Sequence, residues 1–223
     1  MLKSLVLLVM LSGACTFAIF ELLDSYYPFV LASEEARKSL EVTTAQMKEL
    51  RGAELASDMI AYAVFSALFC GSLAACCSVS RNAGGQLLGL GVGLVAGVAA
   101  GAAMGWLGHW LELNPTFVIA DPMIYAIVRW SIMLLPVATV AGLATSVSSA
   151  SGIQIVHTIL GAILGAVLAA MIYSVTVGTF TTIETRSKIL PFHDANRILL
   201  VGACTFCIGA GALLVLHRKV ARA

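Results

Sequence analysis

The chain has 223 residues, of which 60% are hydrophobic and only 11% are charged, and its formal net charge is +1. A soluble globular domain typically carries about 25% charged residues, so this composition excludes that class of protein. A near-neutral charge also argues against a nucleic-acid partner, for which a basic chain is expected. The sequence therefore predicts an all-α membrane protein whose first partner is the lipid bilayer itself.

Six apolar segments are long enough to cross the roughly 30 Å hydrocarbon core of a bilayer. In chain order, these predicted spans cover residues 1–23, 58–80, 84–111, 123–145, 152–180 and 196–216. The first begins with Lys3 and an apolar run, as a signal peptide does, but the run continues past Cys15 to Phe20. We therefore expect an uncleaved first span, which makes six transmembrane helices with both chain ends on one side of the membrane.

A long polar segment, residues 24–57, separates the first two spans. Its second half, residues 33–57, predicts an amphipathic helix, because Ser33 suits a helix cap and apolar residues recur near one face. No proline follows before Pro115, so this helix is expected to continue into the second span. Its charged face is either solvated or a docking surface for a partner.

The third span carries a glycine at every fourth position. These glycines are Gly85, Gly89, Gly93, Gly97, Gly101 and Gly105. Residues four apart advance about 400° along an α-helix, so the glycines form a narrow ridge that winds slowly around it. Such a ridge allows a second helix to approach until the backbones nearly touch, within the protein or between two copies. A groove for a ligand or a lipid is the alternative.

An internal repeat relates the middle of the chain to its last third at an offset of 68 residues. Residues 78–80, with the sequence SVS, return as residues 146–148, and two ridge glycines return as Gly161 and Gly165. Since 68 residues hold two spans, the repeat predicts three tandem two-helix hairpins with Gly/Ala-rich packing. Their predicted bounds are 1–80, 81–148 and 149–223, the last with a basic C-terminal tail.

The two sides of the membrane differ, because long loops lie within the hairpins and short SVS turns lie between them. We predict that the SVS turns and both termini face the cytoplasm of a bacterial inner membrane, since the basic tail HRKVAR directly follows the last span. A raw count of Lys and Arg favours the opposite orientation. All tryptophans and tyrosines lie toward the loop side, which indicates either one well-anchored interface or an aromatic vestibule.

Charged residues near the loop-side ends of the spans are the candidates for a functional site. They are Glu21, Glu112 and Glu184 at the ends of first helices, and Arg129 and Arg197 in second helices. Three carboxylates brought together would form a ring at a pore mouth, whereas Glu–Arg pairs would pin the hairpin ends. Arg129 lies about two turns inside its span, where a charge is costly. Pro136, in the same span, predicts a kink or hinge.

The sequence predicts no enzyme, cofactor or metal site, because it has no local catalytic motif and no metal-ligand spacing of His or Cys. The six cysteines all lie in apolar runs, which is typical of packing residues. No Asp, Glu or Lys is expected at a membrane midplane. We favour a non-enzymatic structural or accessory subunit that assembles with other membrane subunits, or with itself through Gly/Ala faces. A channel or facilitative transporter for a small solute or ion is the alternative.

Overall fold

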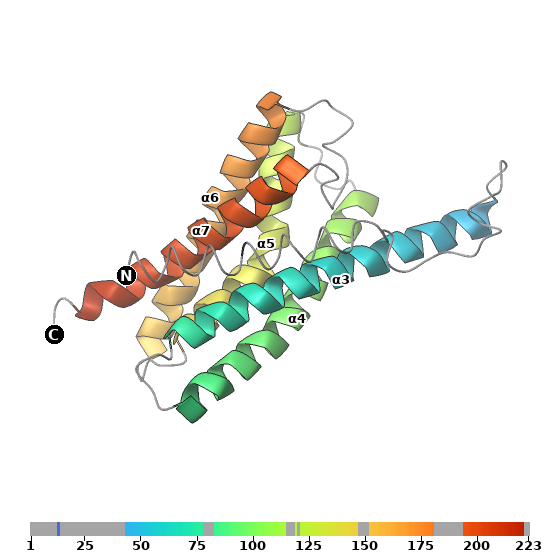
Figure 1. Cartoon of the computed structure of the whole chain (residues 1–223). Coiled ribbons are helices and arrows are strands. Elements are labelled where there is room, and N and C mark those ends of the chain that lie inside the picture. The colour runs from blue at the N-terminus through green and yellow to red at the C-terminus, as the bar shows by residue number, and fades with distance from the viewer. Residues whose placement is uncertain are drawn as a thin grey trace.

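The computed structural model describes residue 13 and residues 43–77, 83–114, 119, 121–146, 152–180 and 194–220, with the backbone alone for residues 83–86, 180, 194, 195, 197 and 215–220. These ranges hold five long helices and no strand (Figure 1). The helices are α3 (Thr44–Cys77), α4 (Ala83–Leu113), α5 (Pro122–Ser146), α6 (Gly152–Phe180) and α7 (Asp194–Val220). The predicted all-helical fold is therefore confirmed for this part of the chain.

Four of the helices, α3 to α6, are each long and apolar enough to cross a bilayer. By helix length and hydropathy the chain is a multi-pass membrane protein, as its composition predicts. Helix α7 adds a shorter apolar stretch, Ile198–Leu214. Apart from Gly13, the first predicted span lies outside the described residues, so the total of six spans stays a prediction.

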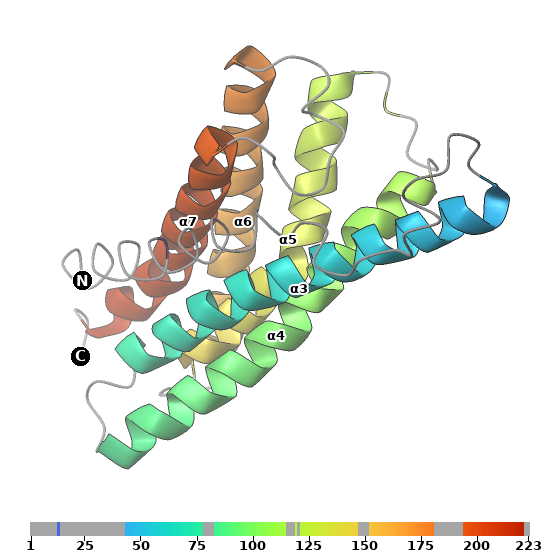
Figure 2. The ribbon, with the colours of Figure 1, turned by 45° about the vertical axis from the view of Figure 1, so that its right-hand side comes forward.

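Helix α3 begins at a reciprocal cap. The backbone N–H of Thr43 donates to Gln46 Oε1 at 2.9 Å, and the backbone N–H of Gln46 lies 3.4 Å from the Thr43 hydroxyl oxygen. This is the capping box that Thr-x-x-Gln encodes. With 34 residues, α3 is about 51 Å long and exceeds the hydrocarbon thickness by roughly 20 Å. It begins at Thr44 and not at the predicted position after Ser33, because the Thr43 cap starts the helix there. From Thr44 it continues without a break into the second predicted span, as predicted, and its first turns project beyond the other helices (Figures 1 and 2).

The helices pack mainly against their neighbours in the chain. Helix α3 contacts α4 most extensively, α5 contacts α6, and α6 contacts α7, whereas α4 and α5 share a smaller contact. Figure 2 shows α3 and α4 side by side. The most extensive contact thus crosses residues 80 and 81, the boundary between the first two predicted hairpins. The three-hairpin division itself stays a prediction.

The glycine ridge of α4 faces α3. Four of its glycines abut the α3 backbone in one antiparallel register: Gly93 at Cys70, Gly97 at Ser66, Gly101 at Tyr62 and Gly105 at Met59. A Cβ atom on Gly97 would lie 2.5 Å from the Ser66 carbonyl oxygen, closer than real side chains approach. Gly89 is also buried, and the surroundings of Gly85 are not among the described features. The ridge therefore brings together two helices of the same chain.

The predicted ridge glycines of α6 face the following helix instead of the preceding one. A Cβ atom on Gly165 would meet the Cys207 carbonyl oxygen, and one on Gly211 would meet the carbonyl oxygen of Gly161. Both contacts join α6 to α7. Glycines that correspond in the 68-residue repeat thus face different partners: those of α4 face the preceding helix α3, and those of α6 face the following helix α7. An internal structural repeat stays a prediction.

Helix α5 contains Pro136 in its interior. Proline has no backbone N–H, so the carbonyl of Ile132, four residues earlier, loses its intrahelical donor. Both views show α5 changing direction along its length, as such a loss allows (Figures 1 and 2). Whether Pro136 acts as a moving hinge stays a prediction.

The outward faces of α4 and α6 are apolar. Val95 and Leu164 are 74% and 71% exposed in the isolated chain, and Leu87 is 69% exposed. Large contiguous apolar surfaces are rare on soluble monomers, whereas lipid tails are as apolar as leucine. These side chains are therefore the expected lipid contacts.

Candidate functional site

Buried polar side chains of α3, α5 and α6 gather toward the end of the bundle at which α3 and α5 begin. Asp58 and Tyr62 of α3 are 4% and 1% exposed. The Arg129 side chain of α5 is 10% exposed, and Tyr173 of α6 is buried. Tyr62 interacts electrostatically with the other three. We call these four side chains the buried polar cluster; ionisable groups within membrane-spanning helices are by default candidates for function.

An ion pair connects the buried polar cluster to the end of α4. Glu112 Oε2 lies 3.8 Å from Arg129 Nη2, which is an electrostatic contact too long for a hydrogen bond. The Glu112 side chain is 46% exposed, so the pair leads from the interior to the surface. Nη2 is buried and has no hydrogen-bond partner within the described ranges. The guanidinium thus keeps an N–H group that can donate a hydrogen bond to a carboxylate, a phosphate or another anion.

Aromatic packing holds Arg129 in place. The rings of Trp130 and Tyr173 meet edge to face, with centroids 4.9 Å apart and an interplanar angle of 73°. Such a pair contributes about 0.5–1.5 kcal/mol beyond the area it buries. Because Trp130 follows Arg129 directly, this contact helps to fix the rotation of α5 against α6, and with it the point at which the Arg129 side chain leaves the helix. Part of the aromatic excess toward the loop side therefore packs inside the bundle rather than at an interface.

The structure brings together one of the predicted carboxylate–arginine pairs, Glu112 with Arg129. Glu21 and Glu184 lie outside the described residues, and Arg197 is described only as part of the α7 backbone. The ring of three glutamates and the second salt bridge therefore stay predictions. Among the described residues, no group of three His, Cys, Asp or Glu side chains is arranged to hold a metal ion.

Three members of the buried polar cluster, Asp58, Tyr62 and Tyr173, are not among the site residues that the sequence predicts. In the sequence, Asp58 marks only the start of the span predicted for residues 58–80. The overlooked signal is a second every-fourth series on α3, formed by Asp58, Tyr62, Ser66, Cys70 and Ala74, all of them buried. This series has the same spacing as the glycine ridge and lies against it, so the ridge buries the polar residues along with the small ones.

Comparisons of the chain with models of protein families, with curated proteins and with solved structures find no match. Inference about function therefore depends on two features of the molecule. One is the buried polar cluster with its ion pair to Glu112. The other is the part of α3 that projects beyond the bundle.

Proposed function

We propose that this multi-pass membrane protein is a non-enzymatic structural or accessory subunit that assembles with a partner in a membrane complex. The observation that carries the proposal is the projecting start of α3. Of residues 44–52, only Gln46 and Leu50 are even partly buried, and Met47 is 47% exposed. An ordered, capped helix that shows charged and apolar side chains outside the bundle is suited to contact another protein.

The rest of the fold serves as the scaffold in this proposal. Residues 1–23 supply a first span and α7 the last, which completes six spans in three hairpins. Gly93, Gly97, Gly101 and Gly105 are occupied by α3 of the same chain, so other subunits or further copies bind other Gly/Ala faces of the bundle, while the outward face of α4 around Val95 stays in lipid. The lack of a catalytic motif in the sequence supports a non-enzymatic role.

The test is site-specific photo-crosslinking combined with native mass spectrometry of the protein extracted gently from its own membrane. A photoreactive residue at Ala45, which is exposed on the projecting turns, is expected to capture one defined protein. The same protein is expected in stoichiometric amount in the native complex. The matched control is Val95, which is 74% exposed on the lipid-facing side of α4 and should yield no protein adduct.

A partner-free monomer without an adduct at Ala45 would contradict the accessory role. A homo-oligomer crosslinked through Ala45 would instead identify a second copy of the chain as the partner. The mass of the native complex, together with the presence and mass of an adduct, distinguishes these results.

A channel or facilitative transporter is the second candidate, and Arg129 is the observation that favours it. A buried guanidinium with an unused donor is suited to attract an anionic solute into the bundle. Flux of small anions into liposomes that contain the purified protein tests this function. Flux that disappears in Arg129→Met while the fold persists would favour transport over the accessory role.

The proposed orientation predicts which cysteines react from which side. Cys76 and Cys77 are partly exposed at the end of α3 that precedes the first SVS turn, whereas Cys70 is fully buried. A membrane-impermeant maleimide is expected to label Cys76 or Cys77 from the cytoplasmic side and to leave Cys70 unlabelled, as read by peptide mass mapping. Labelling from the opposite side alone would reverse the orientation.

A further inference from the structure

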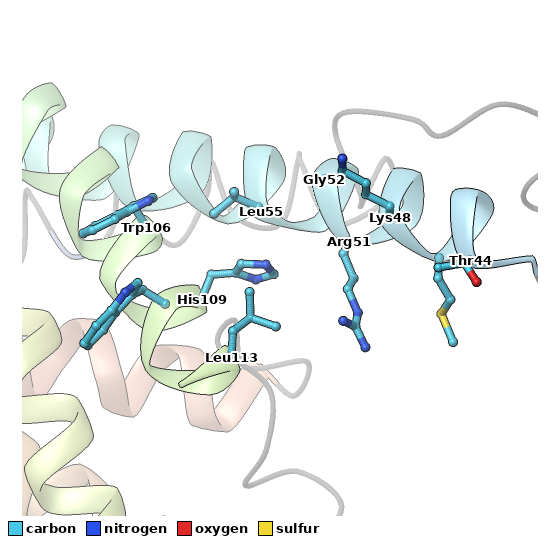
Figure 3. Close-up of a pocket in the computed structure, with 10 residues that line it drawn as sticks. Thr44, Lys48, Arg51, Gly52, Leu55, Trp106, His109 and Leu113 are labelled. Atoms are coloured by element: carbon cyan, nitrogen blue, oxygen red, sulfur yellow. The ribbon is translucent and has the colours of Figure 1, made fainter. Parts of the chain in front are cut away.

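A groove lies between the projecting start of α3 and the end of α4 (Figure 3). Its volume is about 700 Å³, which is within the range of small-molecule binding sites. Its lining combines cationic, aromatic and aliphatic side chains. They include Lys48, Arg51 and Leu55 of α3, and Trp106, His109 and Trp110 of α4.

The groove exists because the glycine ridge stops. His109 and Leu113 occupy the next two every-fourth positions after Gly105, and both line the groove. Where glycine lets the backbones touch, an imidazole and then a leucine hold them apart, and Figure 3 shows His109 pointing into the space between the helices. Across from them on α3, a Cβ atom on Gly52 would meet nothing within 4 Å. The opening is therefore a built feature of this helix pair.

The charged side chains that line the groove, Lys48 and Arg51, are both cationic. Arg51 leaves α3 on the side where His109 and Leu113 lie (Figure 3). No acidic side chain is among the described residues that line the groove. Neither Arg51 nor Lys48 forms an ion pair within the described ranges. Cations without an ion pair among the described residues are complementary to a phosphate, which a guanidinium can bind with two parallel hydrogen bonds.

The groove also crosses the boundary between hydrocarbon and headgroups. Trp106 and Trp110 are 49% and 41% exposed on the last turns of α4, the depth at which tryptophan is enriched in membrane proteins. Arg51 lies on the part of α3 that continues past that depth. The groove is thus apolar toward the membrane and cationic toward water, which is the polarity of a phospholipid entering from the bilayer. A free anion would match the cations but not the tryptophan wall.

We propose that this groove binds an anionic glycerophospholipid, with the phosphate against Arg51 and the first part of the acyl chains against Trp106 and Trp110. Basic pockets beside membrane helices are known to recruit anionic headgroups. This proposal goes beyond the accessory role, because the bilayer and not a partner subunit supplies the ligand; both proposals use the first turns of α3.

Quenching of tryptophan fluorescence by brominated lipids tests the proposal on the full chain in mixed micelles. Trp106 and Trp110 are exposed to the lipid, whereas Trp130 is buried. We expect brominated phosphatidylglycerol to quench at a lower concentration than brominated phosphatidylcholine with the same chains. Arg51→Gln should raise the half-quenching concentration of phosphatidylglycerol about fivefold. Gly52→Leu should do the same by filling the groove, and Gly91→Leu, at an open position outside it, should not.

Competition separates a lipid from other occupants. Excess glycerol phosphate or inorganic phosphate should leave the quenching by phosphatidylglycerol unchanged, and full displacement by either would overturn the lipid assignment in favour of a free anion. Equal quenching by the two lipids, or wild-type behaviour of Gly52→Leu, would also overturn it. If Gly52→Leu removes a co-purifying protein while lipid quenching persists, the groove binds a polypeptide instead.

Discussion

Replacing Gly101 with leucine is expected to lower the free energy of unfolding by about 3 kcal/mol or more. Any side chain at this position would meet the carbonyl group of Tyr62 and the backbone of Ala63, so the new atoms press on backbone rather than on a flexible side chain. Helices α3 and α4 can accommodate leucine only by separating, which also exposes the buried polar cluster. Unfolding in mixed micelles of rising dodecyl sulfate content, followed by circular dichroism, measures the change.

Gly91→Leu is the matched control for this variant. It makes the same substitution in the same helix, ten residues from Gly101, at an exposed position where a Cβ atom meets nothing within 4 Å. We expect its unfolding free energy to stay within about 0.5 kcal/mol of the native protein, as for a surface substitution. If both variants unfold alike, the ridge is not the contact that holds α3 to α4.

Arg129→Met is expected to leave the fold intact and to change the unfolding free energy by no more than about 1 kcal/mol, because the carboxylate that it leaves unpaired, Glu112, is 46% exposed and stays solvated. The guanidinium is buried, its contact with Glu112 is 3.8 Å long, and one of its nitrogens has no hydrogen-bond partner in the described structure. Methionine has a comparable length and no charge to desolvate. Glu112→Met should lower the free energy of unfolding by about 2 kcal/mol, because it leaves the arginine buried without its carboxylate.

The two single variants and the double variant form a cycle that isolates the pair. If Arg129→Met lowers the free energy of unfolding by about 3 kcal/mol, the arginine is a structural anchor and its charge is not kept for transport. Preserved stability combined with lost anion flux would show that the charge is kept for transport. Preserved stability with unchanged assembly and no flux in either protein would favour the accessory role.

The helices of the described region were predictable because the bilayer demands them. A lipid-exposed backbone must satisfy its own hydrogen bonds, so long uncharged runs such as 84–111, 123–145 and 152–180 become helices. The structure places α4, α5 and α6 at Ala83–Leu113, Pro122–Ser146 and Gly152–Phe180. The continuation of α3 from the polar segment into the second predicted span was also predictable, since no proline interrupts it.

The candidate site was only partly predictable. Arg129 could be identified because a charged residue two turns inside an apolar span is visible in the sequence itself. Asp58 could not, because a carboxylate at the predicted edge of a span is ordinarily solvated, and its burial follows only from the packing of the folded bundle, in which Gly105 of α4 abuts the backbone of Asp58 and Met59. The groove at Arg51 depends on which large residues follow the last ridge glycine and on what lies across from them.

The glycine spacing shows most clearly which features follow from the sequence and which follow only from the tertiary structure. Every-fourth glycine is enough to state that some helix will approach closely, since no side chain keeps it away. It does not state which helix, because a glycine has no side chain with which to select a partner. The selection is made by the opposing faces: the ridge of α4 fits the small and polar series of α3, while Gly161 and Gly165 of α6 meet α7. Spans and close approach therefore follow from local composition, whereas partner, burial and site follow from surfaces that meet only in the folded bundle.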